Sequence, residues 1–254
     1  MPRASLAFLI GLLVLWQWLA SSGLLPRYLT SPAVIAREFA LLLQTGELFQ
    51  HSAVSLYRSL AGLALGAGLG IGIGLAAGTS RRVAGFFEPL VSLTYPVPKV
   101  ALLPILLVWF GISDTSKILL IAVSCFYPCY IAALYGVRAV DPIWIWASQN
   151  MGASPRQVFF KVIVPAAGVH IFGGLRVSLA LAFILMVASE LIGSSNRLGL
   201  GFLIINADAG GRFDIMFAAI VAIAILGFAA DRLLLGLRKR WLAGYAVMEE
   251  SAHA

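Results

Sequence analysis

Hydrophobic and polar positions alternate along the chain on the scale of whole helices. A transmembrane helix needs about 20 apolar residues to cross about 30 Å of hydrocarbon. Six apolar runs approach or exceed that length, and polar or proline-containing segments separate them. They cover residues 6–20, 53–78, 86–110, 116–135, 169–192 and 215–235. The pattern predicts an all-α, polytopic transmembrane helical bundle with about six spans, formed by residues 1–254 as a single domain.

Composition excludes a soluble protein. Hydrophobic residues make up 61% of the chain and charged residues 11%, and the mean hydropathy is +0.95. A soluble protein of this length could not bury so much apolar surface. The net charge of +7 therefore indicates Lys and Arg in cytoplasmic loops against anionic membrane lipid, rather than binding of nucleic acid. Cys125 and Cys129 lie inside one apolar run, and we interpret them as buried small hydrophobes.

Glycines form a regular pattern in the second apolar run. Gly66, Gly70, Gly74 and Gly78 recur every four residues, so they form a ridge that allows another helix to approach closely. Two interpretations remain open at this point. The ridge packs against another helix of the same bundle, or it forms a face for a second subunit.

Two further segments are predicted to lie on the external side. Ser31 and Pro32 begin a predicted amphipathic helix along the outer membrane face, and Gly46 ends it. Residues 193–212 form a predicted glycine-rich external loop. That loop docks an external protein, folds back as a gate, or is a solvated connector.

The longest polar interruption, residues 141–165, contains two helix starts in succession. Asp141 is a predicted N-cap before a proline, and Gly152 is placed where a short helix ends in a left-handed residue. Ser154 then opens a capping box, and Pro165 is predicted to end the second helix. The segment therefore predicts a rigid helix–corner–helix structure that another protein could push.

This interruption resembles the cytoplasmic loop of ABC importer permeases, which carries a Glu-Ala-Ala…Gly…Ile-x-Leu-Pro pattern. Ala147, Gly152 and Pro165 match in register, whereas Ser148 replaces the second Ala and Trp146 stands in place of Glu. The resemblance implies that residues 141–165 couple the chain to an ATPase. The predicted coupling residues are Trp146, Ala147, Ser148, Gly152, Ala153, Ser154 and Pro165.

Five more segments resemble the permease branch that serves aliphatic sulfonates, taurine and nitrate. They are residues 95–104, 109–112, 136–138, 188–193 and 200–204. The resemblance implies a type I ABC importer permease in a bacterial cytoplasmic (inner) membrane. Its implied partners are two copies of an ATP-binding subunit, a second copy of the permease and a periplasmic or lipid-anchored binding protein. ATP and magnesium are then expected on the ATPase, and no cofactor on this chain.

Several activities are not supported by any motif. The chain has no P-loop, nucleophile elbow or His-Glu-x-x-His sequence, so we expect a transport subunit rather than an enzyme. His51, His170 and His253 are far apart in the sequence, and we interpret them as interfacial residues rather than a metal site. The competing functions are a secondary transporter or channel, and a membrane scaffold without transport activity.

Positive charges predict the orientation. With the N-terminus in the cytoplasm, eleven Lys and Arg residues lie inside and six outside. This bias favours cytoplasmic termini and a cytoplasmic 141–165 loop. The six assigned to the outside are Arg27, Arg37, Arg58, Lys117, Arg197 and Arg212.

The third apolar run carries a charge near its middle. Pro96, Pro98 and Pro104 surround Lys99, so regular helix cannot continue through this point. We predict that Lys99 faces a cavity shared by two permease copies and attracts an anion. The alternative is that Lys99 pairs with Glu190 of the fifth run. Lys99, Glu190 and Arg58 are the candidate residues of the translocation path.

Overall fold

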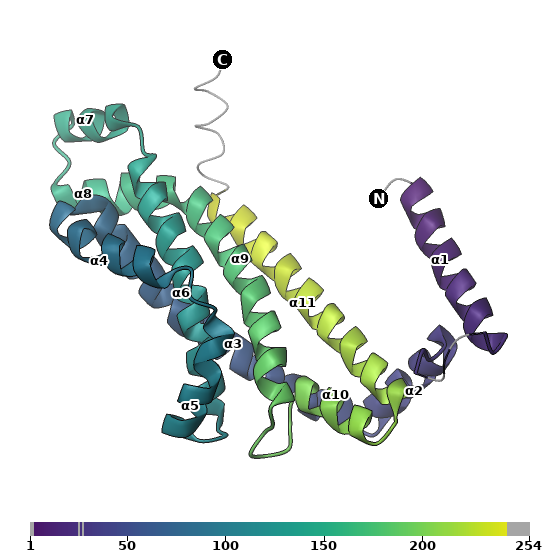
Figure 1. The fold of residues 1–254 in the computed structure, drawn as a ribbon. Helices are drawn as coiled ribbons and strands as arrows, with labels where there is room; N and C mark the ends of the chain where they lie inside the picture. Colours follow the sequence, from purple (N-terminus) through teal and green to yellow (C-terminus); the bar gives the residue numbers. More distant parts are fainter. Residues whose placement is uncertain (1–2, 25, 27, 243–254) are drawn as a thin grey trace. The chain divides into compact units, whose positions relative to one another are not determined.

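The computed structural model describes residues 3–24, 26 and 28–242, so the prediction for His253 lies outside it. All regular elements in the described residues are helical, as the sequence predicts (Figure 1). The α-helices are α1 (Arg3–Ser21), α2 (Pro32–Gln44), α3 (Glu47–Thr79), α4 (Arg81–Thr94), α5 (Leu103–Phe110), α6 (Asp114–Arg138), α7 (Pro142–Asn150), α8 (Pro155–Val158), α9 (Val164–Leu191), α10 (Leu200–Ala209) and α11 (Phe213–Leu242). A 3-10 helix, η1 (Lys99–Leu102), and a π-helix, η2 (Phe159–Ile163), complete the set.

Four helices are long and apolar enough to cross a membrane: α3, α6, α11 and the continuous helix Pro155–Leu191. The third predicted span is instead divided into α4 and the η1–α5 helix, which bend by 91° and count as a fifth span only together. The first predicted span gives a shorter apolar helix, Ala7–Ser21. Over the residues that the structure describes, length and apolarity therefore support four spans, or five with the bent pair. Helix α1 has 19 residues in all, and Ala7–Ser21 is its described apolar part.

The chain divides into two compact units. One contains the residues up to Tyr57 together with Val187–Leu226, and the other contains Arg58–Met186 and the residues from Gly227 onward. Helices α3, α9 and α11 contribute residues to both units.

The first unit packs α2, α10 and the start of α11 around one apolar cluster that includes Leu42, Leu200, Leu203 and Ala219. The predicted limits of the amphipathic helix are confirmed, since α2 begins at Pro32 and the following Gly46 has a φ of +77°. The prediction for residues 193–212 is partly wrong. Ten of these residues form α10, whose apolar side chains Leu200 and Leu203 are buried.

In the second unit, the glycine ridge of α3 packs against α6. A Cβ atom at Gly66 would collide with the backbone of Ala122, and one at Gly70 would lie 2.5 Å from the carbonyl oxygen of Phe126. Of the two interpretations of the ridge, packing within the same chain is therefore confirmed.

The cysteines of α6 lie in the same interior. The Sγ atom of Cys125 donates to the Ser178 carbonyl at 3.3 Å, and the Sγ of Cys129 lies 3.2 Å from Ser178 Oγ. Both side chains are buried, as predicted, neither is in a disulfide, and their contacts with Ser178 join α6 to α9.

The close approach of α3 to α6 predicts a position-dependent response to one methyl group. We expect Gly66→Ala to lower the free energy of unfolding by about 1–3 kcal/mol, because the extra carbon overpacks the helix contact. Gly68→Ala is the matched control, since Gly68 lies on the same helix and its Cβ would meet nothing within 4 Å. Thermal unfolding of the purified variants in detergent measures the difference. Equal midpoints for the two variants would contradict the assigned packing.

Candidate coupling loop and charged sites

Helix α7 begins where the sequence predicts. The Asp141 Oδ1 atom accepts a hydrogen bond from the Ile143 N–H at 2.8 Å, and Pro142 occupies the first helical position. An N-cap carboxylate accepts a hydrogen bond from one of the free amide groups, and its negative charge interacts favourably with the positive end of the helix dipole. The start of α7 is therefore defined by two adjacent residues.

The corner after α7 is a Schellman motif followed by a capping box. Gly152 has a φ of +80°, its N–H donates to the Gln149 carbonyl at 2.9 Å, and the Ala153 N–H donates to the Ser148 carbonyl at 3.0 Å. The Ser154 N–H then donates to Gln157 Oε1 at 2.7 Å, while Ser154 Oγ accepts from the Gln157 N–H at 3.4 Å. The predicted glycine corner and capping box are both confirmed. Because both helix ends are satisfied, the angle between α7 and α8 is fixed locally.

Pro165 does not end the second helix, and that prediction is wrong. Helix α8 continues through η2 into α9, giving one continuous helix of 37 residues from Pro155 to Leu191. A proline in a helix lacks an N–H and clashes with the carbonyl four residues earlier, here Lys161. The wide π-helical turn η2 lies directly before Pro165 and contains Lys161. A π-helical turn relieves this clash without breaking the helix.

The predicted coupling residues divide into two groups. Trp146, Ala147, Gly152 and Ser154 are exposed and Ala153 is half-buried, whereas Ser148 and Pro165 are buried. Ser148 donates to the Ile145 carbonyl within α7, and Pro165 lies in the first turn of α9.

Helix α7 carries an exposed apolar surface. Ile143 is 62% exposed, Trp146 63% and Met151 81%. Figure 1 shows α7 beyond the ends of α6 and α9, connected to them only by short segments. An apolar surface on a projecting and locally rigid helix is suited to contact with another protein.

Lys99 occupies the break between α4 and α5. Its Nζ atom donates to three backbone carbonyl oxygens, those of Thr94 at 3.0 Å, Tyr95 at 2.6 Å and Val97 at 2.8 Å. The same atom lies 4.1 Å from the centre of the Tyr127 ring. The ammonium group thus donates to carbonyls at and just beyond the end of α4, of which that of Thr94 also accepts from the Val97 N–H at 3.2 Å. Its charge is favourable at the negative end of a helix.

The predicted irregularity at Lys99 is confirmed. The bonds of its ammonium group indicate a local structural role that the sequence analysis did not consider. Its proposed exposure to a translocation path stays a prediction.

Arg58 and Lys117 are fully buried in the second unit. The guanidinium of Arg58 binds Asp114 Oδ1, with the Nε atom at 2.8 Å and the Nη2 atom at 2.6 Å. This ion pair attaches α3 to the first turn of α6. Arg58 and Lys117 are therefore interior residues of the bundle, and the side of the membrane to which they were assigned stays a prediction.

Glu190 belongs to the first unit, where its carboxylate caps α10. Oε2 accepts from the Gly201 N–H at 2.9 Å, and the Ser55 hydroxyl donates to the carboxylate at 2.8 Å. Ser55 Oγ also accepts from the Leu200 N–H at 2.8 Å. A carboxylate and a hydroxyl therefore satisfy the first two amide groups of a buried helix.

The α10 cap also explains His51, which was predicted to be interfacial but is buried. Its Nδ1 atom lies 2.8 Å from the Gly199 carbonyl oxygen. Among the described residues, no group of three His, Cys, Asp or Glu side chains could hold a metal ion. No sequence pattern predicted the α10 cap, because its residues are up to 148 positions apart.

Comparison with known proteins decides the family. Residues 68–242 match the model for the binding-protein-dependent transport system inner membrane component. The chain belongs to this family. It is a membrane-spanning permease of a binding-protein-dependent ABC importer, a multi-pass protein of the inner membrane. The family assignment replaces the alternatives of a secondary transporter, a channel and a scaffold.

The relatives include permeases named for sulfur compounds. The chain is 37% identical over 242 residues to the taurine transport system permease protein of Escherichia coli, covering 93% of this chain and 87% of that one. It is 36% identical over 232 residues to a putative aliphatic sulfonates transport permease protein of Bacillus subtilis, covering 91% of this chain and 83% of that one.

A solved structure supports the fold. The inward-facing MetNI methionine ABC transporter matches with a TM-score of 0.58 at 18% identity, covering 76% of this chain and 94% of that chain. The permease therefore has the type I ABC importer fold, as predicted.

Because Lys99 binds three backbone carbonyls, we expect its substitution to destabilise the fold as well as to change the local charge. We expect Lys99→Met to lower the free energy of unfolding by about 2 kcal/mol or more, because three charge-assisted hydrogen bonds are lost. Lys99→Arg should retain part of this stability. Thermal unfolding of the purified permease measures the change, and uptake is compared after correction for folded protein.

The control for Lys99→Met is Lys239→Met, which removes an exposed lysine near the end of α11. If Lys99→Met unfolds like Lys239→Met but lowers uptake, the lysine acts in the path and the structural role is wrong.

Proposed function

We propose that this permease forms the translocation path for a small organic sulfonate, of the aliphatic sulfonate or taurine type, delivered by a binding protein. The names of the relatives support this substrate class. Nitrate, which the sequence also suggested, receives no support from these names. The permease acts as a homodimer, because a half-path with four or five spans needs a second copy to enclose a cavity.

Coupling to ATP hydrolysis occurs through α7 in this proposal. The observation that carries it is the exposed apolar surface of α7, held at a fixed angle by the Gly152 corner. Two ATPase subunits bind the two α7 helices of the homodimer. ATP and magnesium bind the ATPase subunits, and the permease itself needs no cofactor. With Trp146 in place of the family glutamate, the contact is mainly apolar instead of an ion pair.

The energetic requirement of this coupling is modest. Moving a transporter from a 1:99 to a 99:1 population of two states requires about 5.5 kcal/mol of differential binding. Burial of Ile143, Trp146 and Met151 in one state only supplies an energy of this order, at about 1.5–3 kcal/mol for each large side chain. A contact confined to α7 is therefore sufficient.

The orientation that coupling needs places α7 in the cytoplasm. Both termini then lie in the cytoplasm, and the predicted bias of eleven positive charges inside against six outside supports this arrangement. Residues 193–199, between α9 and α10, then lie on the external side.

Cysteine labelling in intact cells tests the orientation. We expect Arg156→Cys, at an exposed position of α8, to resist a membrane-impermeant maleimide until the membrane is permeabilised. Ser195→Cys, exposed between α9 and α10, should react from outside. The reverse pattern would place α7 outside and remove the basis for ATPase contact.

Gly152→Val tests the coupling corner. A non-glycine residue at positive φ costs roughly 1–2 kcal/mol, and a β-branched side chain costs more. The variant should insert normally and retain ATPase activity in the assembled complex, but sulfonate uptake in proteoliposomes should fall at least tenfold.

Gly46→Val is the matched control for Gly152→Val. Gly46 has a similar φ of +77°, and its Cβ would also meet nothing within 4 Å. The control therefore introduces the same backbone strain away from α7. Wild-type uptake by Gly152→Val, or an equal loss in both variants, would contradict a specific role for the corner.

A further inference from the structure

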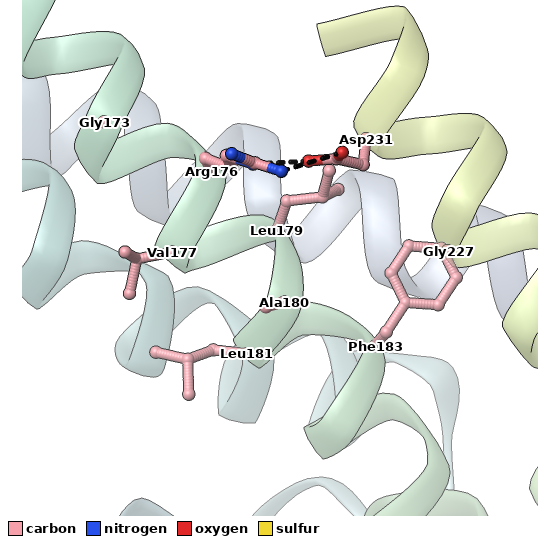
Figure 2. A pocket seen from close by; sticks show the side chains of 9 residues that line it. All are labelled: Gly173, Arg176, Val177, Leu179, Ala180, Leu181, Phe183, Gly227 and Asp231. Carbon is pink, nitrogen blue, oxygen red and sulfur yellow. Dashed lines mark hydrogen bonds and ion pairs between the residues drawn. The ribbon is translucent and has the colours of Figure 1, made fainter. Parts of the chain in front are cut away.

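A cavity of about 600 Å³ opens between α9 and α11 in the second unit (Figure 2). Its walls are mostly apolar, with Val177, Ala180 and Phe183 among the lining residues. Its polar side chains are Arg176 and Asp231, which meet across the gap between the two helices. The cavity therefore combines an extended apolar wall with one pair of charges.

Two glycines make room for the cavity. Gly173 of α9 and Gly227 of α11 both line it, and a Cβ atom at either position would meet nothing within 4 Å. These glycines differ from those of the α3 ridge, where a Cβ would collide with α6. The space beside Gly173 and Gly227 is therefore open, and no other side chain of the described residues fills it.

Arg176 retains hydrogen-bonding capacity toward this space. Its Nε atom donates to Asp231 Oδ1 at 2.7 Å, and its Nη2 atom donates to Asp231 Oδ2 at 3.1 Å. A guanidinium carries five N–H donors, so three have no partner among the described residues. The Arg176 side chain is 57% exposed. Asp231 thus holds the guanidinium in place while leaving donors for a second oxyanion.

The position of this pair makes the unused donors significant. Arg176 lies roughly 18 Å along α9 from its first residue, within a helix long enough to cross the membrane. A charged group on a membrane-spanning helix is costly within the hydrocarbon unless it faces protein, water or a ligand. A ligand that satisfies the donors and also covers the apolar wall must have an oxyanion at one end and an aliphatic chain at the other.

We propose that this cavity is a substrate site, which holds an aliphatic sulfonate with its sulfonate group on Arg176 and its chain along the wall formed by Val177, Ala180 and Phe183. The proposal rests on the proposed function for the substrate class. It adds that the permease itself selects by chain length, independently of the binding protein. Asp231 is a positioning residue that orients Arg176.

Direct binding tests the site. The probes are radiolabelled ethanesulfonate, butanesulfonate and octanesulfonate, added to the permease–ATPase complex in neutral detergent without binding protein. We expect the affinity to increase with chain length. The double variant Arg176→Gln/Asp231→Asn, which leaves no unpaired charge, should bind all three probes at least tenfold more weakly.

A variant that fills the cavity tests the contribution of the aliphatic chain to affinity separately from that of the charged group. Gly227→Leu places a side chain in the open space and keeps the ion pair, so octanesulfonate affinity should fall several-fold more than ethanesulfonate affinity. Gly236→Leu is the matched control, since Gly236 lies on α11 outside the cavity and its Cβ also meets nothing within 4 Å. Equal effects of these two variants, or wild-type affinity in the double variant, would overturn the proposal.

An anionic lipid also combines an oxyanion with aliphatic chains, so a second binding experiment distinguishes lipid from sulfonate as the occupant of the cavity. Binding is repeated in bilayers of phosphatidylcholine alone and with phosphatidylglycerol added. Sulfonate binding that persists in both supports a substrate site. Displacement by phosphatidylglycerol, with wild-type uptake by the double variant, would assign the cavity to lipid and overturn the substrate site.

Failure of the substrate site differs from failure of the proposed function. If sulfonate-loaded binding protein stimulates ATP hydrolysis and uptake equally in wild type and Gly227→Leu, the proposed function stands and the cavity proposal is wrong. If the wild-type complex transports no sulfonate, the substrate class itself is wrong.

Discussion

Hydrocarbon supplies no hydrogen bonds, so each backbone break and each charge in a membrane-spanning protein must find a partner inside the protein. Several polar groups of this permease follow that constraint, whereas the buried Tyr130 hydroxyl has no hydrogen-bond partner among the described residues. The break between α4 and α5 is satisfied by the ammonium group of Lys99, and the start of the buried helix α10 is satisfied by Glu190 and Ser55. In each case a side chain of opposite charge occupies the end of a helix dipole. These polar contacts allow helices to begin and end at positions that apolar packing alone would not tolerate.

The contact between α3 and α6 and the corner between α7 and α8 have different physical origins. Apolar side chains gain little by leaving lipid for a helix interface, so α3 and α6 depend on close van der Waals contact, which the ridge of small residues permits. The loop from α7 to α8 lies outside the apolar spans and depends on capping hydrogen bonds instead. A contact surface on α7 is therefore rigid for reasons that are independent of the membrane-embedded packing.

Local signals in the sequence were sufficient for much of this structure. The Asp141 cap, the Gly152 corner and the capping box at Ser154 each depend on residues within a few positions of one another, and all three are present. The glycine ridge was visible as a four-residue period, although the helix it contacts was not. By contrast, the buried ion pair of Arg58 was not predicted, because its partner Asp114 is 56 residues away. The continuation of the helix through Pro165 depends on a π-helical turn, which no residue pattern in the sequence predicted.

The continuous helix from Pro155 to Leu191 connects the coupling loop with the cavity. Because Pro165 does not interrupt it, α8 and the segment that carries Arg176 belong to one helix. A rotation imposed at the Gly152 corner is therefore carried along this helix, apart from any deformation at the η2 turn. Arg176 is held by Asp231 of α11, so such a rotation must either move α11 as well or change the geometry of the ion pair. A change in the ion pair would alter the donors that face the cavity, so the proposed movement of α7 would have a physical route to the affinity of the proposed site for an anion.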